Sequence, residues 1–89
     1  QSISEIIAVV PNPISSNSHL YVYAANTNAM SMEVYDIKGN RINKCNFFLT
    51  PQSNNQINLS FLRKNAVGTY LLKIRIAGQE FMEKVVVIE

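Results

Sequence analysis

Between residues 69 and 77 the side chains alternate in character from one position to the next. Two basic residues, Lys73 and Arg75, have one parity. Four large apolar residues share the other parity: Tyr70, Leu72, Ile74 and Ile76. A period of two is that of a β-strand, whose successive side chains point to opposite faces of a sheet. The pattern predicts a strand over 69–77 with one face in the core.

Six further segments have the composition of short strands, with polar turns between them. They are residues 5–10, 19–24, 31–37, 41–49, 56–59 and 81–88. The chain holds eighteen Val and Ile residues, which fit a pleated sheet, and eleven Asn and eight Ser residues, which stabilise turns. One helical turn is expected over 60–66, and the crossover helices of a parallel sheet have no room. The sequence therefore predicts an all-β fold, an immunoglobulin-like β-sandwich of about seven antiparallel strands.

Two motifs predict how strands end. Pro11-Asn12-Pro13 follows the first strand. Proline has no backbone N–H, so two prolines this close remove two ladder donors and force an extended, edge-like path. In the segment 36–40, the Asp36 side chain can cap turn amides, and Gly39 can adopt a positive φ without strain. This segment predicts a hairpin between the third and fourth strands.

Gly68 and Tyr70 are expected to have structural roles. The glycine breaks the helical turn before it. A Tyr at the start of an inward-facing strand commonly packs its ring in the core and bonds its hydroxyl to nearby backbone.

The last strand is apolar on both faces from residue 85 to residue 88. This pattern favours a central strand that is buried on both sides. The alternative is a terminal strand that is partly exposed and docks to a receptor by strand pairing.

Length and charge exclude several classes of function. The chain has 89 residues, which make one domain with one modest core. The net charge is only +2 and the basic residues are scattered, so nucleic-acid binding is not expected. No apolar run approaches the ~20 residues that a transmembrane helix needs. The start at Gln1 has neither Met nor a charged region, so we expect the end of a larger protein rather than a signal peptide.

The residues with chemical reactivity are few. The chain has one His, one Asp and one Cys, namely His19, Asp36 and Cys45. A disulfide within the chain is excluded, and a Cys/His metal site lacks ligands. No motif supplies a nucleophile with its base, so no catalytic residue, no cofactor and no enzymatic activity are expected. Cys45 is expected to be a half-buried thiol that could pair between chains, which makes the protein a monomer or a weak dimer.

Four blocks of sequence follow one another in a recognisable order. Together they closely resemble the type A C-terminal sorting domains of the type IX (Por) secretion system of Bacteroidetes. The common form of that family has an aromatic residue before Pro-Asn-Pro, a Tyr-Asp-x-x-Gly hairpin, a Gly-x-Tyr strand start and a final Lys-Val-rich strand. The resemblance covers nearly the whole chain. The blocks are Val10-Pro11-Asn12-Pro13, Val34-Tyr35-Asp36-Ile37-Lys38-Gly39-Asn40-Arg41-Ile42, Gly68-Thr69-Tyr70-Leu71-Leu72-Lys73-Ile74 and Glu83-Lys84-Val85-Val86-Val87-Ile88.

The resemblance implies that the chain is a C-terminal secretion signal. Such domains end secreted cargo proteins and direct them from the periplasm through the outer-membrane translocon to the cell surface or the medium. A surface sortase then usually removes the domain and joins the cargo to lipopolysaccharide. The implied partners are the translocon and the sortase, with anionic lipopolysaccharide as a further candidate. The implied recognition residues are Pro11, Asn12, Pro13, Asp36, Gly39, Gly68, Tyr70, Lys84, Val85, Val86 and Val87.

Three alternatives stay open. The domain could be retained as a docking module of the surface machinery, as in a few members of the family. It could be a carbohydrate-binding sandwich with Tyr21, Tyr23 and Tyr35 as an aromatic platform, although the chain has no Trp. It could also be an immunoglobulin-like spacer between catalytic domains, which predicts further domain sequence after Glu89.

Overall fold

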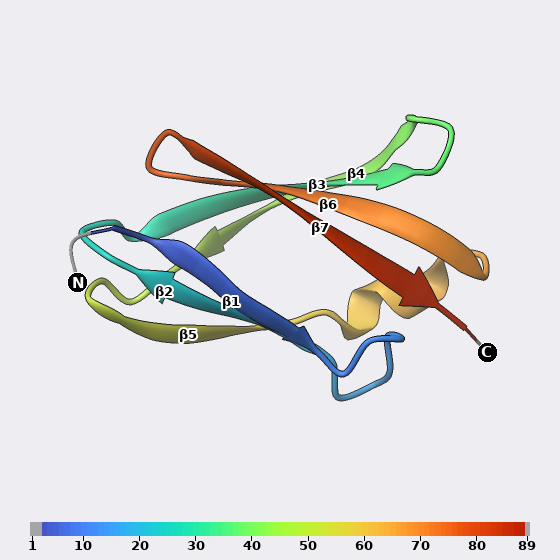
Figure 1. Ribbon diagram of the computed structural model, residues 1–89, viewed down its shortest axis with the longest axis horizontal. Coiled ribbons are helices and arrows are strands. Elements are labelled where there is room, and N and C mark those ends of the chain that lie inside the picture. Colours follow the sequence, from blue (N-terminus) through green and yellow to red (C-terminus); the bar gives the residue numbers. More distant parts are fainter. Residues whose placement is uncertain (1–2, 89) are drawn as a thin grey trace.

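The computed structural model describes residues 3–88, without the side chain of Ile7 (Figure 1). These residues form seven strands and one short 3₁₀ helix, η1. The elements are β1 (Glu5–Val10), β2 (His19–Ala24), β3 (Ala29–Asp36), β4 (Arg41–Phe48), β5 (Ser53–Asn58), η1 (Ser60–Lys64), β6 (Gly68–Ile76) and β7 (Gln79–Val87). Among the described residues, no helix has the length and apolar character needed to cross a membrane.

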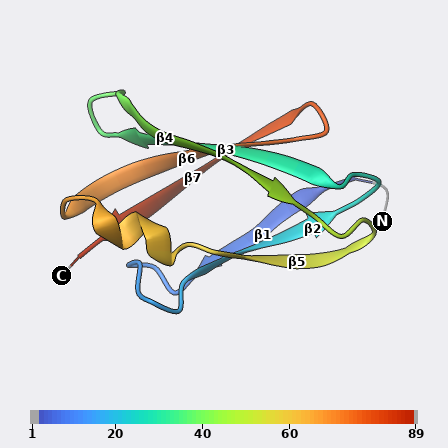
Figure 2. The same cartoon turned by 180° about the vertical axis from the view of Figure 1, so that it is seen from behind.

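The strands form two antiparallel sheets that pack face to face, as Figures 1 and 2 show. One sheet has the order β1-β2-β5, and the other has the order β4-β3-β6-β7. The chain passes from one sheet to the other after β2, after β4 and after β5. This arrangement confirms the predicted all-β, immunoglobulin-like sandwich of about seven antiparallel strands.

The core lies between the two sheets and takes alternate residues from each strand. On β2, β3 and β6 the buried positions follow a period of two. Burial of one large aliphatic side chain contributes roughly 1.5–3 kcal/mol, so this cluster is a main source of stability. The inward face predicted for 69–77 is confirmed. The core members from these three strands are Leu20, Val22, Ala24, Met30, Met32, Val34, Tyr70, Leu72, Ile74 and Ile76.

β1 and β2 begin and end as predicted, whereas other boundaries differ. β5 begins at Ser53 rather than at Gln56, because Asn54 and Asn55 pair with β2 in register. The hydrogen bonds of a sheet are made by backbone groups, so residues with polar side chains can form a strand. Such a strand lacks the apolar alternation by which a sequence pattern is identified as a strand. β3 begins two residues earlier than expected, and η1 ends at Lys64, before the predicted end at residue 66.

The hairpin between β6 and β7 is tighter than expected. Its turn is Ala77-Gly78, whereas Gly78-Gln79 was the predicted turn. Both turn residues have a positive φ, 49° at Ala77 and 83° at Gly78. Two positive φ values in a two-residue loop match the right-handed twist of the flanking strands.

β7 is an edge strand, which corrects the expectation of a central strand buried on both sides. In the described part of the chain, β6 is its one neighbouring strand. Val85 and Val87 are buried, whereas Val86 is half-buried and Ile88 is 51% exposed. Val86 lies on the outer face of the sheet, where its register partner is Thr69 of β6. A short apolar run occurs both in central strands and in partly exposed edge strands, so the sequence pattern did not distinguish these two positions.

Candidate recognition site at the last strand

The hairpin between β3 and β4 is held by the carboxylate of Asp36. Its Oδ1 accepts hydrogen bonds from the backbone N–H groups of Lys38 and Asn40, both at 2.9 Å, and its Oδ2 accepts one from the side chain of Asn40 at 3.2 Å. These bonds, led by the one from the Asn40 backbone, lower the pKa of Asp36 below its usual value. Gly39 has a φ of 88°. The predicted turn roles of Asp36 and Gly39 are confirmed, and their part in recognition stays a prediction.

Gly68 and Tyr70 shape the entry of the chain into β6. Gly68 has a φ of 156°, and a Cβ there would meet nothing within 4 Å, so backbone conformation rather than space favours glycine. The ring of Tyr70 packs in the core, and its hydroxyl donates a hydrogen bond to the carbonyl of Ala66 at 2.5 Å. This contact is the tyrosine corner of immunoglobulin-like sandwiches. The structural role predicted for Tyr70 is therefore confirmed.

Sequence blocks that lie far apart in the chain meet at one end of the four-stranded sheet. Asp36 of β3 pairs with Tyr70 of β6, and Tyr70 pairs with Val85 of β7. Gly68 pairs with Val87 at the end of the same ladder. The C-terminal half of β7 is therefore the common element of the candidate site.

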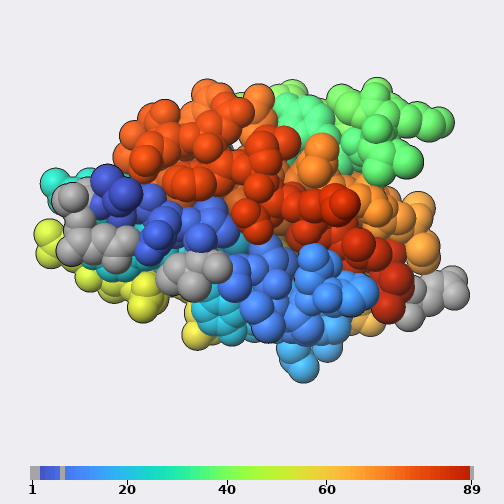
Figure 3. Space-filling view, in the orientation of Figure 1, coloured from blue at the N-terminus to red at the C-terminus, as the bar shows by residue number. Residues whose placement is uncertain are grey.

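The Pro-Asn-Pro segment covers the outer edge of β7. Asn12 accepts a hydrogen bond from the N–H of Val86 through Oδ1 at 3.0 Å and donates one to the carbonyl of Lys84 through Nδ2 at 3.2 Å. The N–H of Ile14 donates to the carbonyl of Val86 at 2.7 Å. Figure 3 shows this early part of the chain, in blue, against the red end of β7. We call residues 12–14 the edge cover.

A residue without a sequence motif, Ser18, holds the edge cover in place. Ser18 is fully buried, and its hydroxyl donates to the carbonyl of Pro11 at 2.7 Å and accepts from the N–H of Ser15 at 2.8 Å. Pro11 and Pro13 are both exposed, and each follows a cis peptide bond. Serine is common in turns, so nothing in the sequence distinguishes Ser18 from the other serines.

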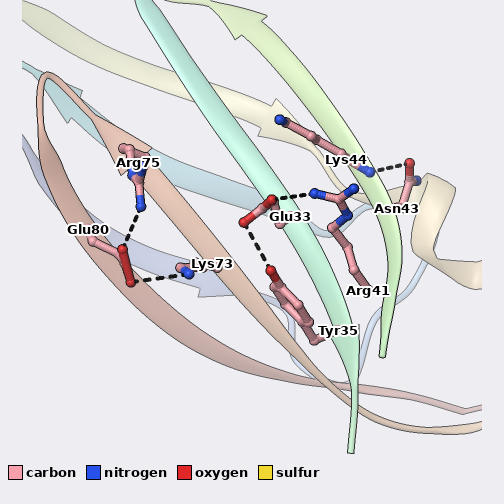
Figure 4. A network of polar contacts seen from close by, with 8 residues as sticks. All are labelled: Glu33, Tyr35, Arg41, Asn43, Lys44, Lys73, Arg75 and Glu80. Atoms are coloured by element: carbon pink, nitrogen blue, oxygen red, sulfur yellow. Dashed lines mark hydrogen bonds and ion pairs between the residues drawn. The ribbon is translucent and has the colours of Figure 1, made fainter. Parts of the chain in front are cut away.

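A charged cluster joins β3 and β4 on the outer face of the four-stranded sheet (Figure 4). Glu33 accepts hydrogen bonds from the guanidinium of Arg41 at 2.9 Å and from the hydroxyl of Tyr35 at 3.1 Å. The bond from Arg41 is the main cause that lowers the pKa of Glu33. This carboxylate is therefore satisfied within the sheet and is a poor candidate for acid–base chemistry.

Two open hollows border β7. One lies on the outer face of the sheet, where Tyr35, Leu71 and Met82 form an apolar wall. Glu80 lies at this hollow and forms ion pairs with Arg75 at 2.8 Å and Lys73 at 3.7 Å, as Figure 4 shows. The other hollow lies beside the C-terminal end of β7, and its lining includes Arg63, Lys64, Val67, Val87 and Ile88. The first hollow combines apolar surface with fixed charges, a combination that suits a side chain of a bound peptide.

The residues of nucleophilic or metal-binding type lie apart from each other. His19 is in β2, where its Nδ1 lies 2.7 Å from the carbonyl oxygen of Asn17. Cys45 is in β4, in the other sheet, and its thiol is half-buried, as predicted. This burial raises the pKa of the thiol. Within residues 3–88, no three His, Cys, Asp or Glu side chains are grouped to hold a metal ion.

The three tyrosines considered as an aromatic platform lie on opposite sides of the molecule. Tyr21 and Tyr23 are on the outer face of β2, in the three-stranded sheet, and Tyr35 is on the outer face of β3, in the four-stranded sheet. The expectation of a shared platform is wrong, because the chain changes sheets between β2 and β3. The two outer faces of a sandwich point away from each other.

A comparison with models of protein families gives a match that covers the whole candidate site. The family model described as "Secretion system C-terminal sorting domain" matches residues 8–88, which include all four sequence blocks. No curated protein matches the chain. The matched family consists of sorting signals and is not a family of enzymes. The chain therefore belongs to the family of C-terminal sorting domains of the type IX secretion system.

Proposed function

We propose that this domain directs a cargo protein through the type IX outer-membrane translocon to the cell surface, where a sortase removes the domain and joins the cargo to anionic lipopolysaccharide. The domain is then the substrate of that reaction and not its agent. Family membership over residues 8–88 supports the sorting role. Removal and anchoring are the steps that the family resemblance adds.

The observation that carries the proposal is the meeting of the family's sequence blocks around β7. Asn12 contacts residues 72 and 74 positions further along the chain, and Tyr70 links Asp36 to Val85 in one register row. A sorting signal has to present the same surface to the secretion machinery whatever cargo protein precedes it. A rigid sandwich that gathers its motifs on one terminal strand meets that need, because strand edges can be read through main-chain hydrogen bonds.

A reporter fusion tests the sorting role. A fluorescent protein with a periplasmic signal peptide carries this domain at its C-terminus, and the same reporter without the domain is the control. Both are expressed in a Bacteroidetes host with and without a working type IX translocon. The reporter is then located by fractionation and sized by immunoblot.

We expect the fusion at the surface or in the medium only when both the translocon and the domain are present. Loss of about the 10.0 kDa of the domain would show removal by a sortase. A full-length fusion at the surface would instead favour the retained docking module. A fusion that stays in the periplasm of both strains would contradict the sorting role and favour the spacer.

A further inference from the structure

The two edges of β7 are paired very differently. Along its inner edge, β7 pairs with β6 at nine successive positions. Along its outer edge, the edge cover supplies one backbone bridge, Ile14 to Val87, and the side-chain amide of Asn12. The inner edge is a continuous ladder, whereas the outer edge is closed at its C-terminal half by a few separate bonds.

The chemistry of the edge cover prevents a longer ladder. Pro11 and Pro13 flank Asn12 and have no N–H to donate. Asn12 is itself exposed, so water competes for both of its hydrogen bonds to β7. Ile14, by contrast, is buried in the core, so the cover opens first at Asn12 and its full displacement also removes the Ile14 side chain from the core.

The first half of the same outer edge has no strand paired to it, although β1 of the other sheet contacts β7. Lys84 and Val86 direct backbone groups to the edge cover, and alternate residues of a strand direct their N–H and C=O groups to the same edge. The backbone groups of Glu80 and Met82 therefore point to this edge, and no hydrogen bond from any described residue reaches them. The side chain of Glu80 is held on the sheet face by its ion pairs with Lys73 and Arg75 of β6, so it is directed away from the outer edge. An open edge of this kind is a template for pairing with another strand.

We propose that an extended segment of the sorting machinery adds to β7 as a further strand, beginning on the open half and displacing the edge cover. This inference deepens the proposed function and rests on it, because it names the surface through which the machinery recognises the domain. Main-chain hydrogen bonds to β7 provide affinity, and the side chains beside the edge provide specificity.

The side chains beside this edge define the chemistry of the incoming strand. Met82 is 51% exposed and lies at the apolar hollow with Tyr35 and Leu71. Lys84 is exposed two residues further on the same face, and no ion pair within residues 3–88 uses its ammonium group. The complementary strand carries an apolar side chain beside Met82 and an acidic side chain beside Lys84, separated by one residue.

An engineered disulfide that locks the edge cover tests the displacement step. Ile14 and Val87 are partners in a parallel bridge. Adjacent strands lie about 4.8 Å apart, within the Cα separation that a disulfide spans. The locked variant is Ile14→Cys with Val87→Cys, in a Cys45→Ser background that removes the natural thiol. The matched control is the same double variant kept reduced with dithiothreitol, which has the same side chains without the bond. Both forms and the wild type are fused to the reporter, and the locked form is oxidised in the periplasm.

We expect the wild-type fusion to be exported with and without dithiothreitol, and export of the locked fusion to be at least tenfold lower in its oxidised form than in its reduced form. Circular dichroism and thermal unfolding of the purified proteins establish that the locked variant is folded. Equal export of a folded, locked variant would overturn the inference and leave the sorting role intact. Failure of the wild-type fusion to be exported would instead remove the proposed function itself.

A second test uses the 89-residue chain without any engineered cysteine. Asn12→Ala removes the acceptor of the Val86 N–H, and exposed Asn26→Ala is the control. Amide hydrogen exchange at Val86 should accelerate roughly tenfold, while exchange at Val85, which faces β6, should not change. Unchanged exchange at Val86 would overturn the inference, because the edge would then be closed by something other than Asn12.

Discussion

β4 and β7 are the two edge strands of one sheet, yet they are protected in different ways. Along β4 nearly every side chain is exposed or half-exposed, and polar residues such as Arg41 and Lys44 line the strand. β7 instead buries Val85 and Val87, and a segment from the start of the chain covers its outer edge. Charged and polar residues on an edge discourage pairing with other chains.

The difference shows two kinds of edge protection with different consequences. The protection of β4 lies in its own residues, so it persists whatever the rest of the chain does. The protection of β7 depends on Asn12 and Ile14, which belong to a distant part of the sequence. A cover of the second kind comes from a separate segment, so its displacement would expose the edge of β7, which is the step that the proposed docking requires.

The largest expected effect is a difference in how much the side chains of the two edge strands contribute to the free energy of unfolding. Val85→Ala on β7 should lower the free energy of unfolding by about 2–3 kcal/mol, because it removes buried methyl groups and leaves a cavity. Phe48 on β4 is 93% exposed, so Phe48→Ala should change it by less than about 0.5 kcal/mol although more atoms are lost. Urea unfolding followed by circular dichroism measures both. Comparable losses from the two variants would show that β4 carries core packing that its exposure conceals.

Tyrosine hydroxyls provide the next comparison. Tyr70→Phe, on the strand that pairs with β7, should lower the free energy of unfolding by about 1–2 kcal/mol, because the carbonyl of Ala66 loses its donor. Tyr35→Phe, on the strand that pairs with β4, should have a smaller effect, since its hydroxyl bonds the half-buried carboxylate of Glu33, which keeps its hydrogen bond from Arg41. Chemical denaturation of both variants decides this. A larger effect at Tyr35 would contradict the importance of the tyrosine corner.

The turns that lead into the two edge strands should respond in opposite directions. Ala77→Gly should raise the free energy of unfolding by about 0.5 kcal/mol, because Ala77 has a φ of 49° that glycine adopts without strain. Gly39→Ala, at a φ of 88°, should lower the free energy of unfolding by about 1 kcal/mol. The cause is backbone strain and not a steric clash, since a Cβ there meets nothing within 4 Å. Thermal melting of the two variants gives the signs. A shift of the same sign in both would refute the strain argument.

The smallest effect concerns pH and belongs to the β4 side of the sheet. The pKa values of Asp36 and Glu33 are lowered in the fold from ordinary values of 3.8 and 4.5. The stability that they contribute is therefore fully present above those values and is lost as pH falls through the lower folded values. The wild type should lose thermal stability on acidification below about pH 4.5, and Asp36→Asn with Glu33→Gln should flatten that dependence. An identical pH profile for this double variant would contradict the assignment.

The sequence predicted most of what local chemistry controls. The alternation around Leu72 and Ile74 indicated which face is buried, because the two-residue period of a strand is a local property. Asp36 bonds amides only two and four residues away, and Tyr70 bonds a carbonyl four residues away. These contacts depend on neighbours in the chain, so their residue types indicated them in advance.

The candidate site was less predictable because its main contacts are not local. Asn12 was expected in an extended segment that ends the first strand, and nothing in its neighbours indicates that its side chain bonds the last strand 72 and 74 residues further along. Buried Ser18 has no motif at all, and the polar start of β5 has no apolar alternation. The apolar end of β7 suits a central strand and an edge strand equally well.

By itself the sequence determined the all-β class, the number and approximate extent of the strands, and the turn at Asp36 and Gly39, because each follows from interactions within a few residues. Its order of motifs also indicated the family, which the match over residues 8–88 established. Only the tertiary structure decided the strand order, the edge position of β7 and the contact of Asn12 with it. The physical reason is that a backbone edge is closed by whichever segment the fold brings to it, and hydrogen bonds between distant segments leave no local signature in the chain.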